Sequence, residues 1–142
     1  MDIGIDIIEI KRIERLFSAN EAFLKRIYTE KEIQYCNPKK NRFQHYAARF
    51  ATKEAMFKAL GTGWVGAMKW TDIELLNNEK GKPYLNFYGM VKELVEKKNI
   101  GNAKVSLSHC KEYAIAQVLL IPKAVQKFCE NKLTTENAEV YT

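Results

Sequence analysis

Residues 42–60, RFQHYAARFATKEAMFKAL, form the longest stretch of this sequence with a helical pattern. The stretch contains no Gly or Pro and is rich in Ala, the residue with the highest helix propensity. Glycines at positions 61, 63 and 66 follow it, as is typical of a helix end. The pattern therefore predicts one long central helix that ends at Leu60. Its expected apolar stripe consists of Phe43, Ala47, Phe50 and Phe57.

The sequence before this helix predicts one strand and three short helices. Residues 3–8, IGIDII, alternate between apolar side chains and other residues, which indicates a strand buried on one face. A helical period follows over residues 9–17. Asn20 can cap a second helix, and Thr29 with Glu32 has the form of a capping box for a third.

The sequence after the long helix predicts four strands and one helix. Because strands and helices do not alternate regularly, the pattern favours an α+β domain with a small, mainly antiparallel sheet packed with the long helix and the shorter helices. We expect this domain to span residues 1–121 and residues 122–142 to be an extension, helical at first and then frayed. The expected elements are a hairpin of strands 70–76 and 84–87, a helix over 90–98 closed by Gly101, and strands 105–109 and 113–120.

Length and composition restrict the classes of protein. A chain of 142 residues, 46% apolar and 28% charged, fits one globular domain. No apolar run is long enough to cross a bilayer, the first residues lack the positive charge of a secretory signal, and three scattered cysteines fit no disulfide framework. We therefore expect a cytoplasmic protein without a membrane partner. The net charge of +6 indicates an anionic partner but does not identify it.

One carboxylate interrupts the apolar stripe of the long helix. Glu54 falls on the face of Phe50 and Phe57, where an unpaired charge would be costly to bury. It could pair with Lys58 four residues later, a reading that periodicity alone slightly favours, or it could bind a cation. Asp6 poses the same question, and the solvated face of its strand is the simpler placement. Two carboxylates from different elements would suit Mg²⁺, whose remaining positions are filled by water and substrate phosphates.

Basic residues that could contact phosphates are numerous, although any one of them could also be an ordinary surface side chain. Gly61 and its neighbours can bring the backbone close to a ligand but match no nucleotide-binding fingerprint, and also fit a helix C-cap. His109 ends a strand where it could donate to a phosphate, whereas His45 lies on the long helix. The basic candidates are Lys39, Lys40, Arg42, Arg49, Lys53, Lys58, Lys80 and Lys82.

Four blocks of the sequence, in order, resemble the holo-(acyl-carrier-protein) synthase family, the small bacterial type of 4′-phosphopantetheinyl transferase. The resemblance covers about residues 1–121 and implies the 4′-phosphopantetheinyl transferase fold. It implies transfer of 4′-phosphopantetheine from coenzyme A to a serine of apo acyl carrier protein, with Mg²⁺ as cofactor and adenosine 3′,5′-bisphosphate as the other product. The blocks are GIDI at 4–7, RFATKEAMFKALGTG at 49–63, KGKPYL at 80–85 and SLSHCKEYAIA at 106–116.

The resemblance also implies roles for individual residues. Asp6 and Glu54 would bind the metal, which reverses the simpler reading of both, and Glu54 and Lys58 would be catalytic, with Lys58 acting on the leaving bisphosphate. Arg12 and Arg26 would contact the acidic carrier protein. The implied coenzyme A contacts are Lys40, Arg42, Arg49, Lys58, Gly61, Lys82, Pro83 and His109.

The family resemblance further implies a homotrimer with active sites between neighbouring subunits. The main alternative is a basic α+β module that binds nucleic acid without catalysis, which the net charge supports but the lack of interleaved aromatic and basic motifs opposes. We therefore expect no nucleic-acid partner. A third alternative is an inactive subunit that only binds coenzyme A or the carrier protein.

Overall fold

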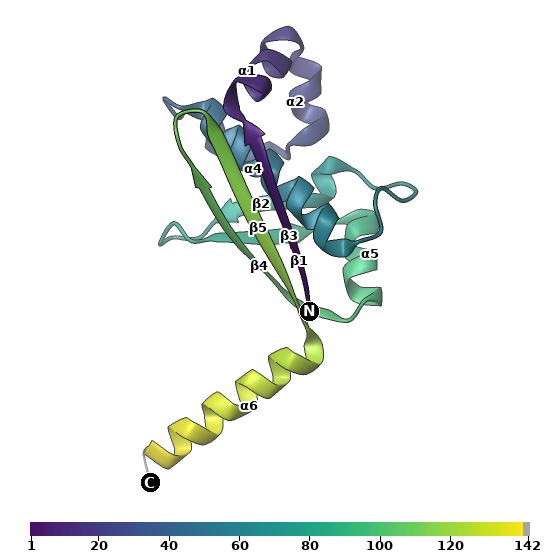
Figure 1. Ribbon diagram of the computed structural model, residues 1–142, viewed down its shortest axis with the longest axis vertical. Helices are drawn as coiled ribbons and strands as arrows, with labels where there is room; N and C mark the ends of the chain where they lie inside the picture. Colours follow the sequence, from purple (N-terminus) through teal and green to yellow (C-terminus); the bar gives the residue numbers. More distant parts are fainter. Residues whose placement is uncertain (141–142) are drawn as a thin grey trace.

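A computed structural model gives the fold, and it describes the backbone of residues 1–140 and the side chains of residues 1–133. Long strands lie against a central helix, short helices gather at one end, and a last helix extends from the other (Figure 1). In chain order the elements are β1 (Asp2–Glu9), α1 (Ile10–Ala19), α2 (Glu21–Ile27), α3 (Glu30–Cys36), α4 (Arg42–Leu60), the 3₁₀ turn η1 (Trp70–Asp72), β2 (Ile73–Asn77), β3 (Pro83–Phe87), α5 (Gly89–Lys97), β4 (Ile100–His109), β5 (Tyr113–Pro122) and α6 (Lys123–Val140).

Two antiparallel sheets make up the β-structure. The larger has the strand order β1-β5-β4, and the β2-β3 hairpin forms the smaller. The expected α+β architecture with a mainly antiparallel sheet and a long central helix is therefore confirmed. Two strand starts differ from the prediction. Trp70–Asp72 forms a 3₁₀ turn before β2, with Asp72 accepting a hydrogen bond from the backbone N–H of Lys69, and β4 begins at Ile100 rather than at residue 105.

Helix α4 has the predicted ends, but its innermost face is not the predicted apolar stripe. Of the predicted stripe, Ala47 and Phe57 are buried but Phe43 and Phe50 only partly, whereas Ala51 and Ala55, outside the stripe, are fully buried. The small alanine side chains let α4 approach β1 closely. A Cβ at Gly4 would overlap the Ala55 carbonyl, so only glycine fits there. The phenylalanines lie to the side of this contact.

In strand β1, the isoleucine face that was predicted to be buried is the exposed one. Ile3, Ile5 and Ile7 are exposed by 59%, 53% and 61%, whereas Ile8 is buried. The reason is that the Gly4 face packs against α4, and alternation requires the isoleucines to point the other way. Asp6 shares the α4 face and its side chain is 17% exposed, so the solvated placement that the strand pattern alone favoured is wrong.

Three of the four predicted local helix signals are confirmed, and one of them is the end of α4 at Gly61. The Asn20 side chain accepts a hydrogen bond from the N–H of Ala22, and Thr29 with Glu32 forms a reciprocal capping box. The predicted stop at Gly101 is wrong, because α5 already ends at Lys97 and Asn99 takes the left-handed conformation that turns the chain. Gly101 instead lies in β4, where α6 begins to pack beside it.

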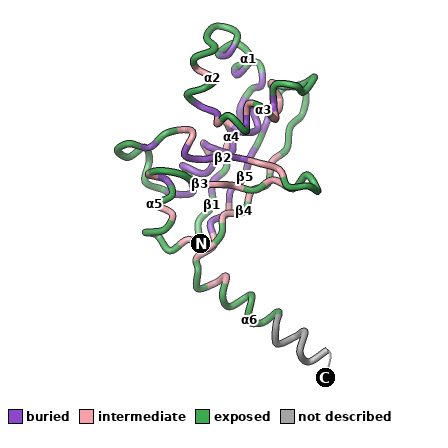
Figure 2. Tube along the Cα trace, turned by 180° about the vertical axis from the view of Figure 1, so that it is seen from behind, coloured by how far each residue is buried: buried purple, intermediate pink, exposed green. Residues whose placement is uncertain are grey.

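The C-terminal segment extends away from the domain as α6 (Figures 1 and 2). Phe128 and Leu133 are both 61% exposed on it. The helix continues to Val140, past the start of the predicted fraying at residue 134, because no Gly or Pro interrupts it; Tyr141 and Thr142 lie outside the described residues. Over the part of the chain that is described, no helix combines the length and the hydropathy needed to span a membrane.

Candidate functional site

Asp6 and Lys58 come together although 52 residues separate them. The Lys58 Nζ lies 2.9 Å from Asp6 Oδ1 and donates a second hydrogen bond, of 3.1 Å, to the carbonyl of Ile5. Strand β1 supplies Asp6 and the C-terminal half of α4 supplies Lys58. The closeness of β1 and α4 at Gly4 therefore brings these side chains within reach of each other.

Glu54, one turn before Lys58 on α4, faces the same place. Its pKa is raised above the usual value, first by burial and next by the negative charge of Asp6, while Lys58 and Arg12 oppose the rise. The two carboxylates are therefore close enough to repel each other. The ion pair of Lys58 is made with Asp6, so the simple i, i+4 pair of Glu54 with Lys58 does not describe this site.

An open cavity of about 480 Å³ adjoins Glu54 and Lys58. Three aromatic rings form one wall: Phe57 lies 5.1 Å from Trp64 and 5.5 Å from Trp70 between ring centroids, and the two indoles are 5.3 Å apart. Gly61, the left-handed C-cap of α4, lies on the rim. The cavity therefore joins a charged end with an apolar wall, which suits a long ligand carrying both charged and apolar groups.

A second group of candidates gathers around Arg49, whose side chain is 3% exposed. Its guanidinium lies 4.3 Å from the centre of the Tyr35 ring and donates to Asn77 Oδ1 at 3.1 Å, but its Nε–H is buried without a partner. Asn77 pairs with Pro83 across the hairpin, so Lys82 and Pro83 lie next to this group. A buried cation with an unused donor is suited to binding an anion.

His109 joins the Arg49 group from the end of β4. Its ring lies 5.9 Å from that of His45, which in turn lies 5.7 Å from the ring of Tyr35. The predicted residues Arg49, Lys82, Pro83 and His109 are thus brought to one region. Lys40 is exposed in the turn just before α4, next to Lys39, whose ammonium lies over the Tyr35 ring.

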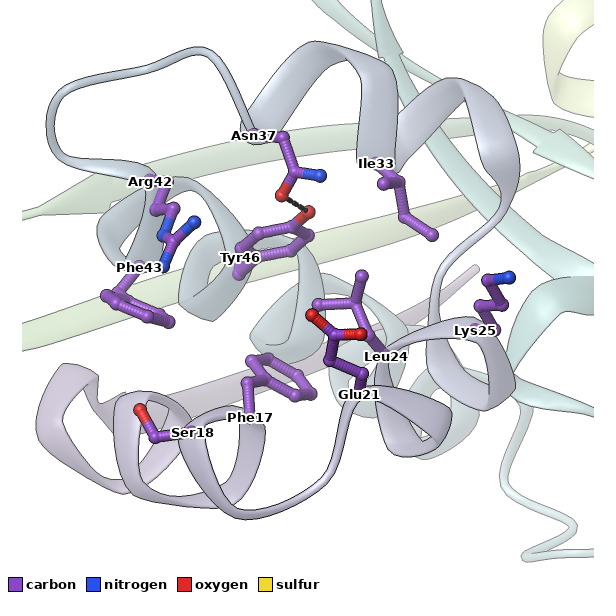
Figure 3. A pocket seen from close by; sticks show the side chains of 10 residues that line it. All are labelled: Phe17, Ser18, Glu21, Leu24, Lys25, Ile33, Asn37, Arg42, Phe43 and Tyr46. Carbon is purple, nitrogen blue, oxygen red and sulfur yellow. Dashed lines mark hydrogen bonds between the residues drawn. The ribbon is translucent and has the colours of Figure 1, made fainter.

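Arg42 does not lie with this group. It lines a separate cavity of about 290 Å³ between α1, α2, α3 and α4, with its guanidinium 4.9 Å from the Phe43 ring. Figure 3 shows Arg42 and Phe43 on one side of this cavity, and Lys25 of α2 on the other. Neither Asp6 nor Glu54 lines it. The expected contact of Arg42 with coenzyme A stays a prediction, and this placement gives it no support.

Three further predicted residues lie in different surroundings. Lys53 is fully buried and paired with Glu32 at 2.8 Å, so it is unavailable to a phosphate. Arg12 on α1 is exposed and close enough to Glu54 to affect its pKa, and Arg26 is exposed on α2. Of the two arginines proposed to contact a carrier protein, Arg12 therefore lies near Glu54, and Arg26 lies on the next helix of the chain.

Several residues of the site were not predicted from the sequence. Tyr35, Asn77, Trp64 and Trp70 carry no charge and belong to no motif, so only their placement reveals them. His45 lies one turn before Arg49 on α4, a spacing that could have linked it to the basic residues. Among the side chains that are described, no three His, Cys, Asp or Glu residues group together as a metal site. A cation there would share its coordination with a substrate.

Comparisons with known proteins agree with this geometry. The profile of the 4′-phosphopantetheinyl transferase superfamily matches residues 2–118. The holo-(acyl-carrier-protein) synthase of Chloroherpeton thalassium is 48% identical over 127 residues, which cover 86% of this chain and 98% of the relative. That of Thermoanaerobacter sp. strain X514 is 43% identical over 119 residues, covering 84% and 86%.

Solved structures resemble the fold as well. The synthase of Neisseria meningitidis superposes with a TM-score of 0.77 at 32% identity and covers 84% of this chain and 96% of its own. That of Helicobacter pylori, solved in complex with coenzyme A, gives a TM-score of 0.72 at 34% identity, covering 83% and 98%. The chain therefore belongs to the 4′-phosphopantetheinyl transferase superfamily and, within it, to the holo-(acyl-carrier-protein) synthase family.

Proposed function

We propose that this enzyme transfers 4′-phosphopantetheine from coenzyme A to a serine of apo acyl carrier protein. The serine oxygen attacks the phosphorus that carries the pantetheine arm, and the bond to adenosine 3′,5′-bisphosphate breaks. The observation that carries this proposal is the meeting of Asp6, Glu54 and Lys58 from two separate elements. Relatives at 43% and 48% identity are holo-(acyl-carrier-protein) synthases, which supports the same reaction here.

Asp6 and Glu54 have the chemistry of a Mg²⁺ site. Both are hard oxygen donors, and the pKa of Glu54 is raised by burial first and then by the negative charge of Asp6, so a cation held by the pair would be stabilising. Two protein carboxylates are the usual number for Mg²⁺ bound together with substrate phosphates. Bound there, Mg²⁺ would neutralise the pyrophosphate.

The side chains of the enzyme provide the remaining electrostatic stabilisation. The side chain of Lys58 is 55% exposed beside the carboxylates, so its ammonium can reach the bisphosphate as negative charge develops there. Arg49 and His109 would hold the phosphate at the other end of the nucleotide, with Lys82 and Pro83 beside them. Lys40 is exposed in the turn just before α4, and Gly61 lines the cavity beside Glu54 and Lys58.

A mass measurement tests the reaction. Purified protein is mixed with coenzyme A, apo acyl carrier protein and Mg²⁺, and the carrier is weighed by mass spectrometry. A transferase adds one phosphopantetheine group to the carrier. An unchanged mass with the intact, folded protein would contradict the proposal. It would favour a protein that binds nucleic acid, coenzyme A or the carrier without catalysis. A carrier whose acceptor serine is replaced by alanine is the control.

We also propose that Arg12 and Arg26 bind the acidic carrier protein. Charge reversal in Arg26→Glu should raise the KM for the carrier about tenfold, because like charges would then face each other across the interface. The KM for coenzyme A should change less than about twofold, since Arg26 is exposed on α2. Steady-state kinetics with each substrate varied in turn measures both. Arg12→Glu should act in the same direction, although Arg12 also affects Glu54.

The control for carrier binding is Lys92→Glu, which reverses one exposed charge on α5. It should leave both KM values unchanged if the effect depends on α1 and α2 rather than on net charge. Equal increases in the two KM values of Arg26→Glu would contradict the assignment.

A homotrimer is supported by the exposed aliphatic face of the larger sheet. Ile3, Ile5 and Ile7 form a row on β1, and Ile115 on β5 pairs with Ile7. Such patches are uncommon on monomers and mark association surfaces. A shallow hollow lined by Ile5, Asp6, Ile7, Lys58 and Ile115 joins this face to the catalytic group, so a neighbouring subunit would border the site.

The expected result for Ile3→Glu is dissociation into monomers in analytical ultracentrifugation, because a charge would be buried in the association surface. Lys92→Glu should remain a trimer. A wild-type protein that sediments as a monomer at all concentrations would contradict the trimer.

We further propose that the enzyme is cytoplasmic and supplies carrier protein to fatty acid biosynthesis. Cys36, Cys110 and Cys129 are free thiols, as a reducing compartment keeps them. Residues 1–121 would be the catalytic domain and residues 122–142 an extension, consistent with the superfamily match over residues 2–118.

A further inference from the structure

Three cationic or ionisable side chains lie against the Tyr35 ring, and a fourth, His109, reaches this group through His45. The Lys39 ammonium lies 4.6 Å and the Arg49 guanidinium 4.3 Å from the centre of the Tyr35 ring. The His45 ring lies 5.7 Å from Tyr35 and 5.9 Å from His109. The chain segments of α3, the following turn, α4 and β4 therefore contribute to one cluster.

No carboxylate forms an ion pair with this cluster in the described part of the chain. The two ion pairs found there are Lys53 with Glu32 and Lys58 with Asp6, and both lie elsewhere. Arg49 is nearly completely buried, and its Nε–H has no acceptor. A buried, uncompensated positive charge is unfavourable until an anion arrives, so the cluster is suited to a phosphate group.

We propose that His45 is a second imidazole of this phosphate site and takes up a proton from solvent when a phosphate monoester binds beside His109. The inference rests on the proposed function, which supplies the ligand: coenzyme A carries such a monoester at its 3′ position. His45 would thus help the enzyme distinguish coenzyme A from 3′-dephospho-coenzyme A. No proton passes to the substrate in this step.

The charges that face His45 explain the direction of proton movement. In the free protein, burial lowers the pKa of His45 first, followed by the positive charges of Arg49, His109 and Lys39. The imidazole is therefore mostly neutral at pH 7. A phosphate monoester brings a charge of nearly −2 into the cluster, reverses the local potential and favours the imidazolium. Binding then draws in a proton, and affinity falls as the pH rises.

The test compares the wild type with His45→Phe, which keeps an aromatic ring against Tyr35 and His109 but cannot bind a proton. Isothermal titration calorimetry is performed with Mg²⁺ and without carrier protein, so that no transfer takes place. Buffers of different ionisation enthalpy give the number of protons taken up on binding. Because the phosphate itself can release protons, only the difference between the two proteins reports on His45.

We expect the wild type to take up more protons with coenzyme A than the variant, by a difference approaching about one proton near pH 7. The variant should bind coenzyme A about tenfold more weakly at pH 6 but less than about threefold more weakly at pH 8.5, where the imidazole is neutral. Both proteins should bind 3′-dephospho-coenzyme A alike. Lys92→Gln, which removes an exposed charge on α5, should behave as the wild type.

Equal proton uptake in the two proteins, or an affinity ratio that does not change with pH, would overturn the role of His45 while leaving the proposed reaction intact. An equal loss of affinity for 3′-dephospho-coenzyme A would also overturn it. If the wild type binds no coenzyme A, the proposed function itself fails. Should His45→Phe not fold, as judged by circular dichroism, His45→Gln provides the same comparison.

Discussion

Glu54→Gln should lower kcat by at least about 100-fold, because a neutral amide cannot replace a carboxylate that neutralises and holds Mg²⁺. A loss of this size corresponds to about 2.7 kcal/mol of transition-state stabilisation. The mass-spectrometric transfer assay, followed over time, measures it. Glu93→Gln, an exposed carboxylate on α5, should retain the full rate. Wild-type activity in Glu54→Gln would show that Glu54 does not bind an essential metal.

The same substitution should raise the thermal midpoint of the metal-free protein at pH 7. The pKa of Glu54 is raised in the folded protein by burial and by Asp6, so ionised Glu54 destabilises the fold. Removing that charge relieves the repulsion. The gain should disappear as the pH falls below about 4.5, the usual pKa of a glutamate, because Glu54 is then protonated in both folded and unfolded states.

Differential scanning fluorimetry in a chelator, repeated with Mg²⁺, measures these effects. Mg²⁺ should raise the midpoint of the wild type and leave that of Glu54→Gln almost unchanged, since only the wild type has both ligands. A lower midpoint of the variant in the chelator would contradict the repulsion between Glu54 and Asp6. The stability test is therefore independent of the activity test.

Local sequence signals predicted the helices well. The bounds of α4 follow from a run without Gly or Pro that ends at Gly61, and the third helix follows from the capping box of Thr29 and Glu32. These signals act over three to five residues, so they do not depend on the rest of the fold. Glu54 was recognised for the same reason, because its helical neighbours are apolar.

It was harder to predict which residues from distant parts of the sequence pack against each other. Alternation in β1 identifies two faces but does not say which one meets α4, and the large isoleucines suggested the wrong one. The decisive feature is the small size of Gly4 and Ala55, which allows a close backbone approach. The exposed isoleucines then need a different explanation, which the proposed trimer supplies. Arg49 and Asn77, 28 residues apart, likewise meet only because distant elements pack together.

Lys53 shows most clearly what a linear pattern leaves out. It precedes Glu54 directly and belongs to a row of basic residues, which suggested a phosphate contact. Its Nζ instead donates to Glu32 and to the backbone carbonyls of Ile73 and Trp70, with no exposed side-chain surface. The partner residues lie 17 to 21 positions away in other elements, so no local period could reveal them.

Lys53→Met should reduce the free energy of unfolding by about 3–5 kcal/mol, because it leaves the buried carboxylate of Glu32 without its counter-charge. In a chain of this length the midpoint should fall by roughly 6–20 °C. Denaturant titration at a fixed protein concentration measures the change, since the stability of an oligomer depends on concentration. Lys92→Met, at an exposed position, should change the free energy by less than about 0.5 kcal/mol.

A double-mutant cycle identifies the ion pair as the cause. Glu32 also accepts backbone hydrogen bonds from Thr29 and Leu75, so Glu32→Gln retains an acceptor while removing the charge. Lys53→Met combined with Glu32→Gln should lose less stability than the sum of the two single variants, by about 0.5–3 kcal/mol. Strict additivity, or a loss below about 1 kcal/mol in Lys53→Met, would contradict a stabilising role. Because Lys53 also holds the carbonyl of Trp70, whose indole lines the cavity beside Glu54, the single variant should disturb the site as well as the fold.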